Sequence, residues 1–214
     1  MSWNLSPSDV FSASPVVPVM VIEQLEDAVP MAQALAAGGI NVFEITLRTA
    51  VALEAITAIR KAMPKALVGA GTVISTQQYD QAVEAGAQFI ISPGFTPSLL
   101  AHAKTADVPL IPGVATPSEV IRAIELGYAH LKFFPASAFG GPSVLKAMAA
   151  PLPQVQFCPT GGINPQNVND YTALDCVATV GGSWMLPKDA IAAKDWAKVT
   201  RLAKEAIELI LSKN

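Results

Sequence analysis

The chain has 214 residues, of which 51% are hydrophobic and only 14% are charged, and its formal net charge is −3. This size and apolar content allow a large core, whereas the slightly acidic balance, with no basic run, argues against nucleic-acid binding. Two cysteines without metal-type spacing favour a reducing compartment. The N-terminus lacks a signal-peptide layout, and the longest apolar run, at 16–22, is too short to span a membrane. We therefore expect a cytoplasmic protein with no membrane or nucleic-acid partner.

Short apolar runs rich in β-branched residues alternate with longer alanine-rich segments of helical period. A short helix is expected at 6–13, before the first strand. The predicted strands are 16–22, 42–48, 66–72, 89–94, 109–115, 130–136, 155–162 and 177–184. The helices with the clearest period are 26–39, 49–64, 75–86, 116–127 and 195–214, and left-handed stops are expected at Gly38, Gly86 and Gly127.

Eight strands that alternate with about eight helices predict a (β/α)8 TIM barrel. The sequence shows no linker and no break in composition, so residues 1–214 are expected to form a single barrel domain. A doubly wound open sheet is the alternative. It is weakened because neither a GxGxxG fingerprint nor a P-loop follows the first strand.

The second strand, 42–48, alternates in polarity, which is unusual for a parallel strand with both faces buried. Glu44, Thr46 and Arg48 share one face because strand side chains alternate. In a closed barrel these three side chains point inward, with Arg48 nearest the mouth at the carboxyl ends of the strands. The alternative is an edge strand with a wet polar face.

Lys132 lies within an apolar strand, whereas the other lysines lie in helices or loops. If Leu131 and Phe133 pack against the helices, Lys132 and Phe134 point inward. Two alternatives are a lysine that extends to the rim and a lysine that pairs with an acid for structural reasons only.

Glycines gather where the predicted strands end, on the face that carries function in such barrels. Thr160, Gly161 and Gly162 follow the seventh strand, and Ser183 follows two glycines at the end of the eighth. Turns of this kind present backbone N–H groups to an anion, so we expect a phosphate site there. Each motif alone is also compatible with an ordinary tight turn.

An amine, a carboxylate and a guanidinium inside one barrel indicate imine chemistry. Burial disfavours the charged form of an amine, and a neutral lysine attacks a ketone to form a Schiff base. Glu44 can move the proton, and Arg48 suits a substrate carboxylate. The residues therefore predict a lysine-dependent aldolase acting on a phosphorylated 2-oxo acid. Metal-assisted aldol chemistry is the alternative, although His102 and His130 belong to no ligand-spaced cluster, and we expect neither metal nor cofactor.

Seven motifs together resemble the 2-keto-3-deoxy-6-phosphogluconate (KDPG) aldolase family over nearly the whole chain. They are FEITLR (43–48), GAGTV (69–73), ISPG (91–94), IPGV (111–114), KFFPA (132–136), PTGGI (159–163) and GGSW (181–184). The resemblance implies a homotrimeric (β/α)8 class I aldolase that cleaves KDPG to pyruvate and glyceraldehyde 3-phosphate in the Entner–Doudoroff pathway. Many relatives also cleave 4-hydroxy-2-oxoglutarate (KHG) to pyruvate and glyoxylate.

The resemblance also implies a role for each matched residue. Lys132 would form the Schiff base, Glu44 would be the general acid/base, and Arg48 and Thr72 would hold the pyruvate carboxylate. The other contacts implied are Pro93 and Phe134 lining the pocket, Thr160 near the new stereocentre, and Gly161, Gly162 and Ser183 binding the phosphate. Three further readings stay open: a sister aldolase for the 6-phosphogalactonate analogue, an enzyme acting mainly on KHG, and a non-catalytic barrel that binds sugar phosphates.

Overall fold

Every strand pairing in the computed structural model is parallel, and the structure describes residues 3–212. Each predicted strand contains an observed one, but the observed strands are shorter. They are β1 (Val16–Met20), β2 (Val42–Thr46), β3 (Leu67–Gly71), β4 (Ile90–Ile91), β5 (Leu110–Ile111), β6 (Gly113–Val114), β7 (His130–Phe133), β8 (Gln156–Pro159) and β9 (Val180–Gly182).

The strands form a six-stranded sheet in the order β5-β4-β3-β2-β1-β9 and a three-stranded sheet in the order β6-β7-β8. Pro112 separates β5 from β6 and so divides the predicted strand 109–115, because proline has no N–H to donate to a neighbouring strand. Isolated parallel bridges join Thr160 to Gly181 and Phe157 to Val177, between the β8 and β9 segments. The sequential order lacks the reversal that defines a doubly wound sheet.

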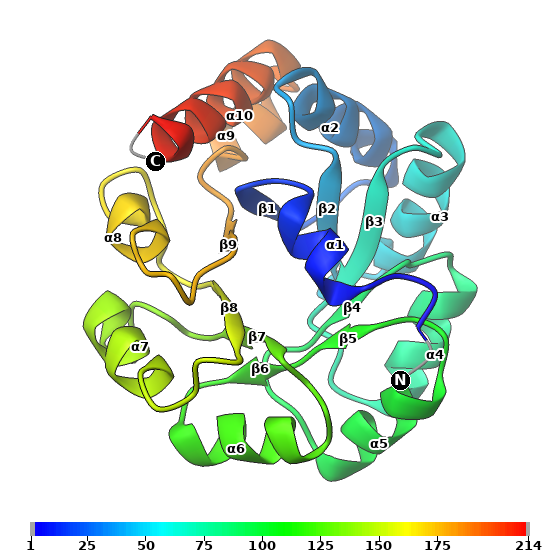
Figure 1. The fold of residues 1–214 in the computed structure, drawn as a ribbon. Helices are drawn as coiled ribbons and strands as arrows, with labels where there is room; N and C mark the ends of the chain where they lie inside the picture. Colours follow the sequence, from blue (N-terminus) through cyan, green and yellow to red (C-terminus); the bar gives the residue numbers. More distant parts are fainter. Residues whose placement is uncertain (1–2, 213–214) are drawn as a thin grey trace.

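Helices surround the strands on the outside, so the chain is an α/β fold with parallel sheets (Figure 1). Their bounds are α1 (Pro7–Ser12), α2 (Leu25–Ala37), α3 (Ala52–Ala62), α4 (Thr76–Glu84), α5 (Pro97–Thr105), α6 (Pro117–Glu125), α7 (Gly141–Ala149), α8 (Val168–Thr172), α9 (Lys188–Ala192) and α10 (Trp196–Leu211). The six predicted helices correspond to α1, α2, α3, α4, α6 and α10. The last two residues of the predicted helix 195–214 lie outside the described residues.

The predicted glycine stops are confirmed at two helices and wrong at the third. Gly86 and Gly127 have φ values of +97° and +90° after α4 and α6. After α2 the left-handed residue is Gly39, with φ of +99°, whereas Gly38 is right-handed with φ of −82°. Gly38 is needed for a different reason: a Cβ there would lie 2.5 Å from the Cβ of Ala203. The glycine thus lets α10 pack against α2.

The short helix α1 lies across the amino-terminal ends of the strands. Its N-cap is Ser6, whose hydroxyl accepts a hydrogen bond from the Ser8 N–H. Val10 and Phe11 are buried, and the Phe11 ring meets the ring of His130 edge-on, with centroids 5.4 Å apart. Because His130 is the first residue of β7, α1 connects the start of β1 to a strand of the other sheet. In residues 3–212 no helix combines the length and apolar character needed to cross a membrane.

Candidate active site

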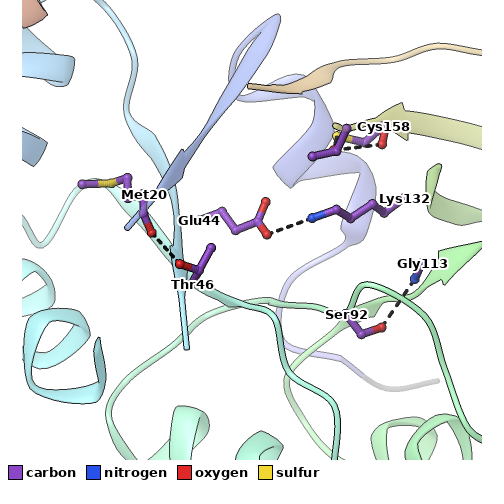
Figure 2. Close-up of polar contacts among 8 residues, drawn as sticks. Met20, Glu44, Thr46, Ser92, Gly113, Lys132 and Cys158 are labelled. Carbon is purple, nitrogen blue, oxygen red and sulfur yellow. Dashed lines mark hydrogen bonds and ion pairs between the residues drawn. The ribbon is translucent and has the colours of Figure 1, made fainter. Parts of the chain in front are cut away.

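Lys132 from β7 and Glu44 from β2 meet in the interior, and their side chains point toward each other from different sheets (Figure 2). The Lys132 Nζ donates to the Glu44 Oε1 at 3.0 Å. Lys132 is 5% exposed and Glu44 is 1% exposed. The inward orientation predicted for both residues is confirmed. The edge-strand alternative is wrong because β2 pairs with β1 on one side and β3 on the other.

The surroundings of the Lys132 amine are a mixture of one charge and apolar groups. Its Nζ lies 5.4 Å from the centroid of the Phe134 ring, within range of a cation–π contact. The alternative of a lysine extending to the rim is wrong, since the side chain is buried. A buried ion pair carries a large desolvation cost and adds little net stability. The pair is therefore better explained by chemistry than by stabilisation.

Two strand glycines make room for the buried polar side chains. A Cβ on Gly71 in β3 would overlap the Glu44 carboxylate, and one on Gly181 in β9 would overlap the Thr160 hydroxyl. From the sequence, glycines at the strand ends were expected to let backbone N–H groups of the protein approach a ligand closely. In the structure, these two instead accommodate the functional side chains themselves.

Cys158 forms part of the wall around the amine, a position that sequence reasoning missed. It lies opposite Lys132 in the β7–β8 pairing, and its Sγ is 3.8 Å from the Thr160 Oγ1. Burial raises the pKa of the Cys158 thiol to about 12, although the charge of Lys132 acts in the opposite direction. The thiol is thus a neutral neighbour. The signal was present, since strand parity places Cys158 and Thr160 on one face.

Two further hydroxyls, those of Ser92 and Thr46, tie neighbouring backbones together near the pair (Figure 2). The Thr46 Oγ1 donates to the Met20 carbonyl at 2.9 Å, and the Gly113 N–H donates to the Ser92 Oγ at 3.4 Å. Both side chains are buried. They hold β2, which carries Glu44, against β1, and the end of β4 against β6, which pairs with the Lys132 strand β7.

The predicted carboxylate ligands lie just beyond the strand ends. β2 ends at Thr46, and the Arg48 N–H turns back to donate to the Thr46 carbonyl at 2.8 Å. Arg48 is therefore exposed at the mouth rather than on an inward-facing strand position, so the predicted strand 42–48 was two residues too long. Thr72 follows β3 with φ of +60°, which is rare for a β-branched residue. Such strained conformations are concentrated at functional sites.

The turn after β8 presents free N–H groups. Gly161 and Gly162 are consecutive left-handed residues, with φ of +101° and +77°. The Gly162 carbonyl accepts from the Asn167 side chain at 2.9 Å, and the Gly161 carbonyl accepts from the Ser137 N–H at 3.0 Å. Within residues 3–212 the N–H groups of both glycines have no protein acceptor. Backbone N–H groups arranged in this way favour an anion.

Arg48 and Ser183 line a common cavity of about 750 Å³ at the carboxyl ends of β1 and β9. Among the described residues, Lys132 and Glu44 are not part of its lining. Pro93 follows β4 and lies against Gly113, where a Cβ would overlap its backbone. The structure thus places the predicted residues in two groups: a buried amine and carboxylate, and a polar rim with an open cavity.

Comparison with known proteins identifies the relatives of this chain. The sequence model of the family described as KDPG and KHG aldolase matches residues 8–202. The chain is 52% identical to the KHG/KDPG aldolase of Escherichia coli K12, with 97% of each chain covered. It is 50% identical to the 2-dehydro-3-deoxy-phosphogluconate aldolase of Dickeya dadantii, covering 96% of this chain and 97% of that one.

Solved structures agree with these sequence matches. KDPG aldolase from Legionella pneumophila, with pyruvate captured as a covalent carbinolamine intermediate, superposes with a TM-score of 0.94. That protein is 51% identical, with 96% of this chain and 99% of that chain covered. The Zymomonas mobilis ZM4 enzyme with 3-phosphoglycerate gives a TM-score of 0.90 at 48% identity, covering 95% and 96%. The chain described here therefore belongs to the KDPG and KHG aldolase family.

Proposed function

We propose that this chain is a class I aldolase that cleaves KDPG to pyruvate and glyceraldehyde 3-phosphate through a Schiff base on Lys132. The observation that carries the proposal is the buried contact of 3.0 Å between the Lys132 amine and the Glu44 carboxylate. The Legionella relative holding pyruvate as a carbinolamine supports the chemistry. The name of the Escherichia coli relative supports cleavage of KHG as a second activity, giving pyruvate and glyoxylate.

In this mechanism the Lys132 Nζ attacks the C2 carbonyl carbon of the substrate to give a carbinolamine, which loses water to form an iminium. Glu44 removes the proton from the C4 hydroxyl, and the C3–C4 bond breaks as its electron pair moves toward the iminium. The aldehyde leaves and an enamine remains. Protonation at C3 by Glu44 and addition of water then release pyruvate and restore the free amine.

The rim residues would hold the two ends of the substrate. Arg48 and Thr72 bind the carboxylate next to the ketone, since a guanidinium suits a carboxylate. The other contacts proposed run along the substrate: Pro93 and Phe134 line the pocket, Thr160 lies near the C4 hydroxyl, and Gly161, Gly162 and Ser183 bind the phosphate. The free N–H groups of the glycines and the 3-phosphoglycerate bound to the Zymomonas relative support this placement.

For the whole chain we propose one closed (β/α)8 domain over residues 1–214, assembled as a homotrimer in the cytoplasm. The bridges between the β8 and β9 segments support closure, and the two free thiols fit a reducing compartment. A single cooperative unfolding transition, the mass in solution by light scattering, and cell fractionation test these three points. Two parts that melt separately would contradict the single domain. A monomer in solution would contradict the homotrimer.

The decisive experiment is borohydride reduction in the presence of pyruvate, followed by peptide mass mapping. We expect a pyruvate adduct on Lys132 and on no other lysine, and inactivation that depends on pyruvate. Lys132→Ala should be folded but neither trapped nor active. An unmodified Lys132 in folded protein would contradict the proposal. Full activity after chelator treatment would separate this mechanism from metal-assisted aldol chemistry.

Two sister activities need a separate comparison. A solved structure described as native KDPGal resembles this chain with a TM-score of 0.84 at 28% identity, well below the identity to KDPG aldolases. We therefore expect the highest kcat/KM with KDPG, measured beside the 6-phosphogalactonate analogue and KHG. Binding of sugar phosphates without turnover of any of the three would instead favour the non-catalytic reading.

A further inference from the structure

The cavity at the carboxyl ends of β1 and β9, called here the β1–β9 cavity, contains charged side chains that have no role in the proposed mechanism. Arg48 and Ser183 line it, and so does Lys188, the first residue of α9. Lys188 follows Ser183 by five positions in the chain and belongs to none of the sequence motifs considered above. An incoming anion is attracted only by cations that are not already paired with an acid. The charged residues of the lining therefore divide into paired and unpaired ones.

Lys194 is occupied by acids of α2. It pairs with Glu26, and its Nζ lies 3.4 Å from the Asp27 Oδ1. The hydrogen bond from Lys194 lowers the pKa of Glu26, which keeps that carboxylate charged. These three lining residues form one ion cluster with a net charge of −1, because one lysine faces two carboxylates. The cluster therefore does not attract an anion.

Lys188 differs from Lys194 because no acid among residues 3–212 is paired with it. Its neighbour Asp189 is neutralised by Lys198, with the two charged atoms 2.6 Å apart. Within residues 3–212 neither Lys188 nor Arg48 makes an ion pair, and the remaining acid of the lining, Glu23, makes none either. The unpaired charges of the β1–β9 cavity are thus two cations and one acid.

We propose that Lys188 contacts the substrate phosphate and so selects phosphorylated over phosphate-free 2-oxo acids. The inference rests on the proposed function, in which Arg48 is committed to the carboxylate at the other end of the substrate. Of the two unpaired cations found in this cavity among residues 3–212, Lys188 then remains for the phosphate, and it shares the cavity with Ser183. Lysine is a common phosphate binder as a point charge on a flexible chain, and a phosphate is the part of the substrate with the most charge to neutralise.

The comparison of two substrates isolates this contact. KDPG carries its phosphate on C6, whereas KHG carries a carboxylate directly on C4 and has nothing at the C6 position. A cation serving the phosphate therefore affects KDPG and has no partner on KHG. Lys188→Gln removes the charge and keeps most of the side-chain length, and Lys188→Arg keeps the charge. Lys104→Gln, on α5 and outside the cavity, makes the same change in net charge and is the matched control.

We expect Lys188→Gln to raise the KM for KDPG about three- to tenfold, the range of an exposed to partly desolvated charge contact. The kcat for KDPG, and kcat/KM for KHG, should stay within about twofold. Lys188→Arg should restore the KM, and Lys104→Gln should change neither substrate. The salt dependence of kcat/KM for KDPG should be weaker in Lys188→Gln, because exposed charges are screened by ions.

Two results would overturn the inference: an unchanged KM for KDPG in Lys188→Gln, or an equal loss of kcat/KM for both substrates. An equal loss would mean that Lys188 serves the structure of the rim rather than the phosphate. Failure of the proposed function looks different, because the wild-type protein would then cleave neither KDPG nor KHG.

Discussion

Glu44 can place its carboxylate beside the Lys132 amine because Gly71, in the neighbouring strand β3, has no side chain. Gly71 pairs with Thr46 in the β2–β3 register, and any Cβ on it would enter the space of the Glu44 carboxylate. A side chain at position 71 would therefore displace the Glu44 carboxylate from its present place beside the amine. A residue with no side chain thus controls the geometry of the reaction.

We expect Gly71→Ala to lower kcat by about 100-fold or more, because small displacements of catalytic groups have effects of this size. The measurement is steady-state cleavage of KDPG, with circular dichroism to show that the fold persists. Gly94→Ala is the control, since a Cβ at Gly94 meets nothing within 4 Å. Nearly wild-type turnover in Gly71→Ala would show that Glu44 has another productive position.

At this scale, parity along the strands was the reliable part of the sequence reading. It predicted that Lys132 and Glu44 both point inward, and the two meet in the structure. It failed for Arg48, because a strand end depends on where the chain turns, and a tight turn back to Thr46 has no clear sequence signal here. Cys158 was overlooked because its thiol was considered for metal and disulfide chemistry alone.

Among the elements, α1 has an unusual role because it packs an aromatic ring against a titratable one. Phe11 covers His130 at the start of β7. Burial lowers the pKa of His130 below its usual value of 6.5. The unfolded chain therefore binds a proton at a higher pH than the folded chain does, and protonation favours unfolding.

The free energy of unfolding should fall as the pH drops through about 6.5, and the His130 contribution to this fall should stop once the pH is below the folded-state pKa. Above about pH 7.5 this contribution should be constant. Urea titrations at a series of pH values test this, with His130→Phe as the variant that cannot titrate. A wild-type-to-variant difference that stays the same from pH 8 to pH 5 would contradict the expectation.

The elements themselves were predicted unevenly. Helices of nine residues or more with a strong apolar period, such as α3 and α10, were found from the sequence. The five-residue helices α8 and α9 were not, because so short a segment contains little more than one turn and shows no period. The nine-residue α5 and α7 were also not singled out, although each has a proline, Pro97 or Pro142, at its first or second position.

At the scale of the whole molecule, the last helix packs on the first long one. Gly38 at the end of α2 lies against Ala203 of α10, and the Thr200 hydroxyl donates to the Ala34 carbonyl at 2.9 Å. Residues more than 160 positions apart in the chain are thus held together. The alternation of strands and helices predicted the α/β fold with parallel strands. The contact between α2 and α10 depends on the spatial order of the helices and could not be read from periodicity.

Gly38→Ala should destabilise the protein by about 1–3 kcal/mol, as overpacking does, since its Cβ would lie 2.5 Å from the Ala203 Cβ and 2.6 Å from the Thr200 carbonyl oxygen. Denaturant unfolding provides the measurement, and Gly94→Ala again serves as the control. Activity per folded molecule should be retained, because the Cβ added at Gly38 meets residues of α10 and none of the residues around the amine. An unchanged unfolding midpoint would mean that α10 can move away from α2 without loss.

The position of α1 also affects how substrate and products can enter and leave the proposed site. In the described chain this helix lies at the amino-terminal ends of the strands (Figure 1). Arg48, Thr72 and Ser183 instead follow the carboxyl ends of β2, β3 and β9. Water, substrate and both products would then enter and leave through the same opening, at the carboxyl ends of the strands. In the proposed mechanism the aldehyde half is released first, while the three-carbon half is still bound to Lys132. Catalysis would follow a fixed order of exit, in which the carbon skeleton that enters deepest leaves last.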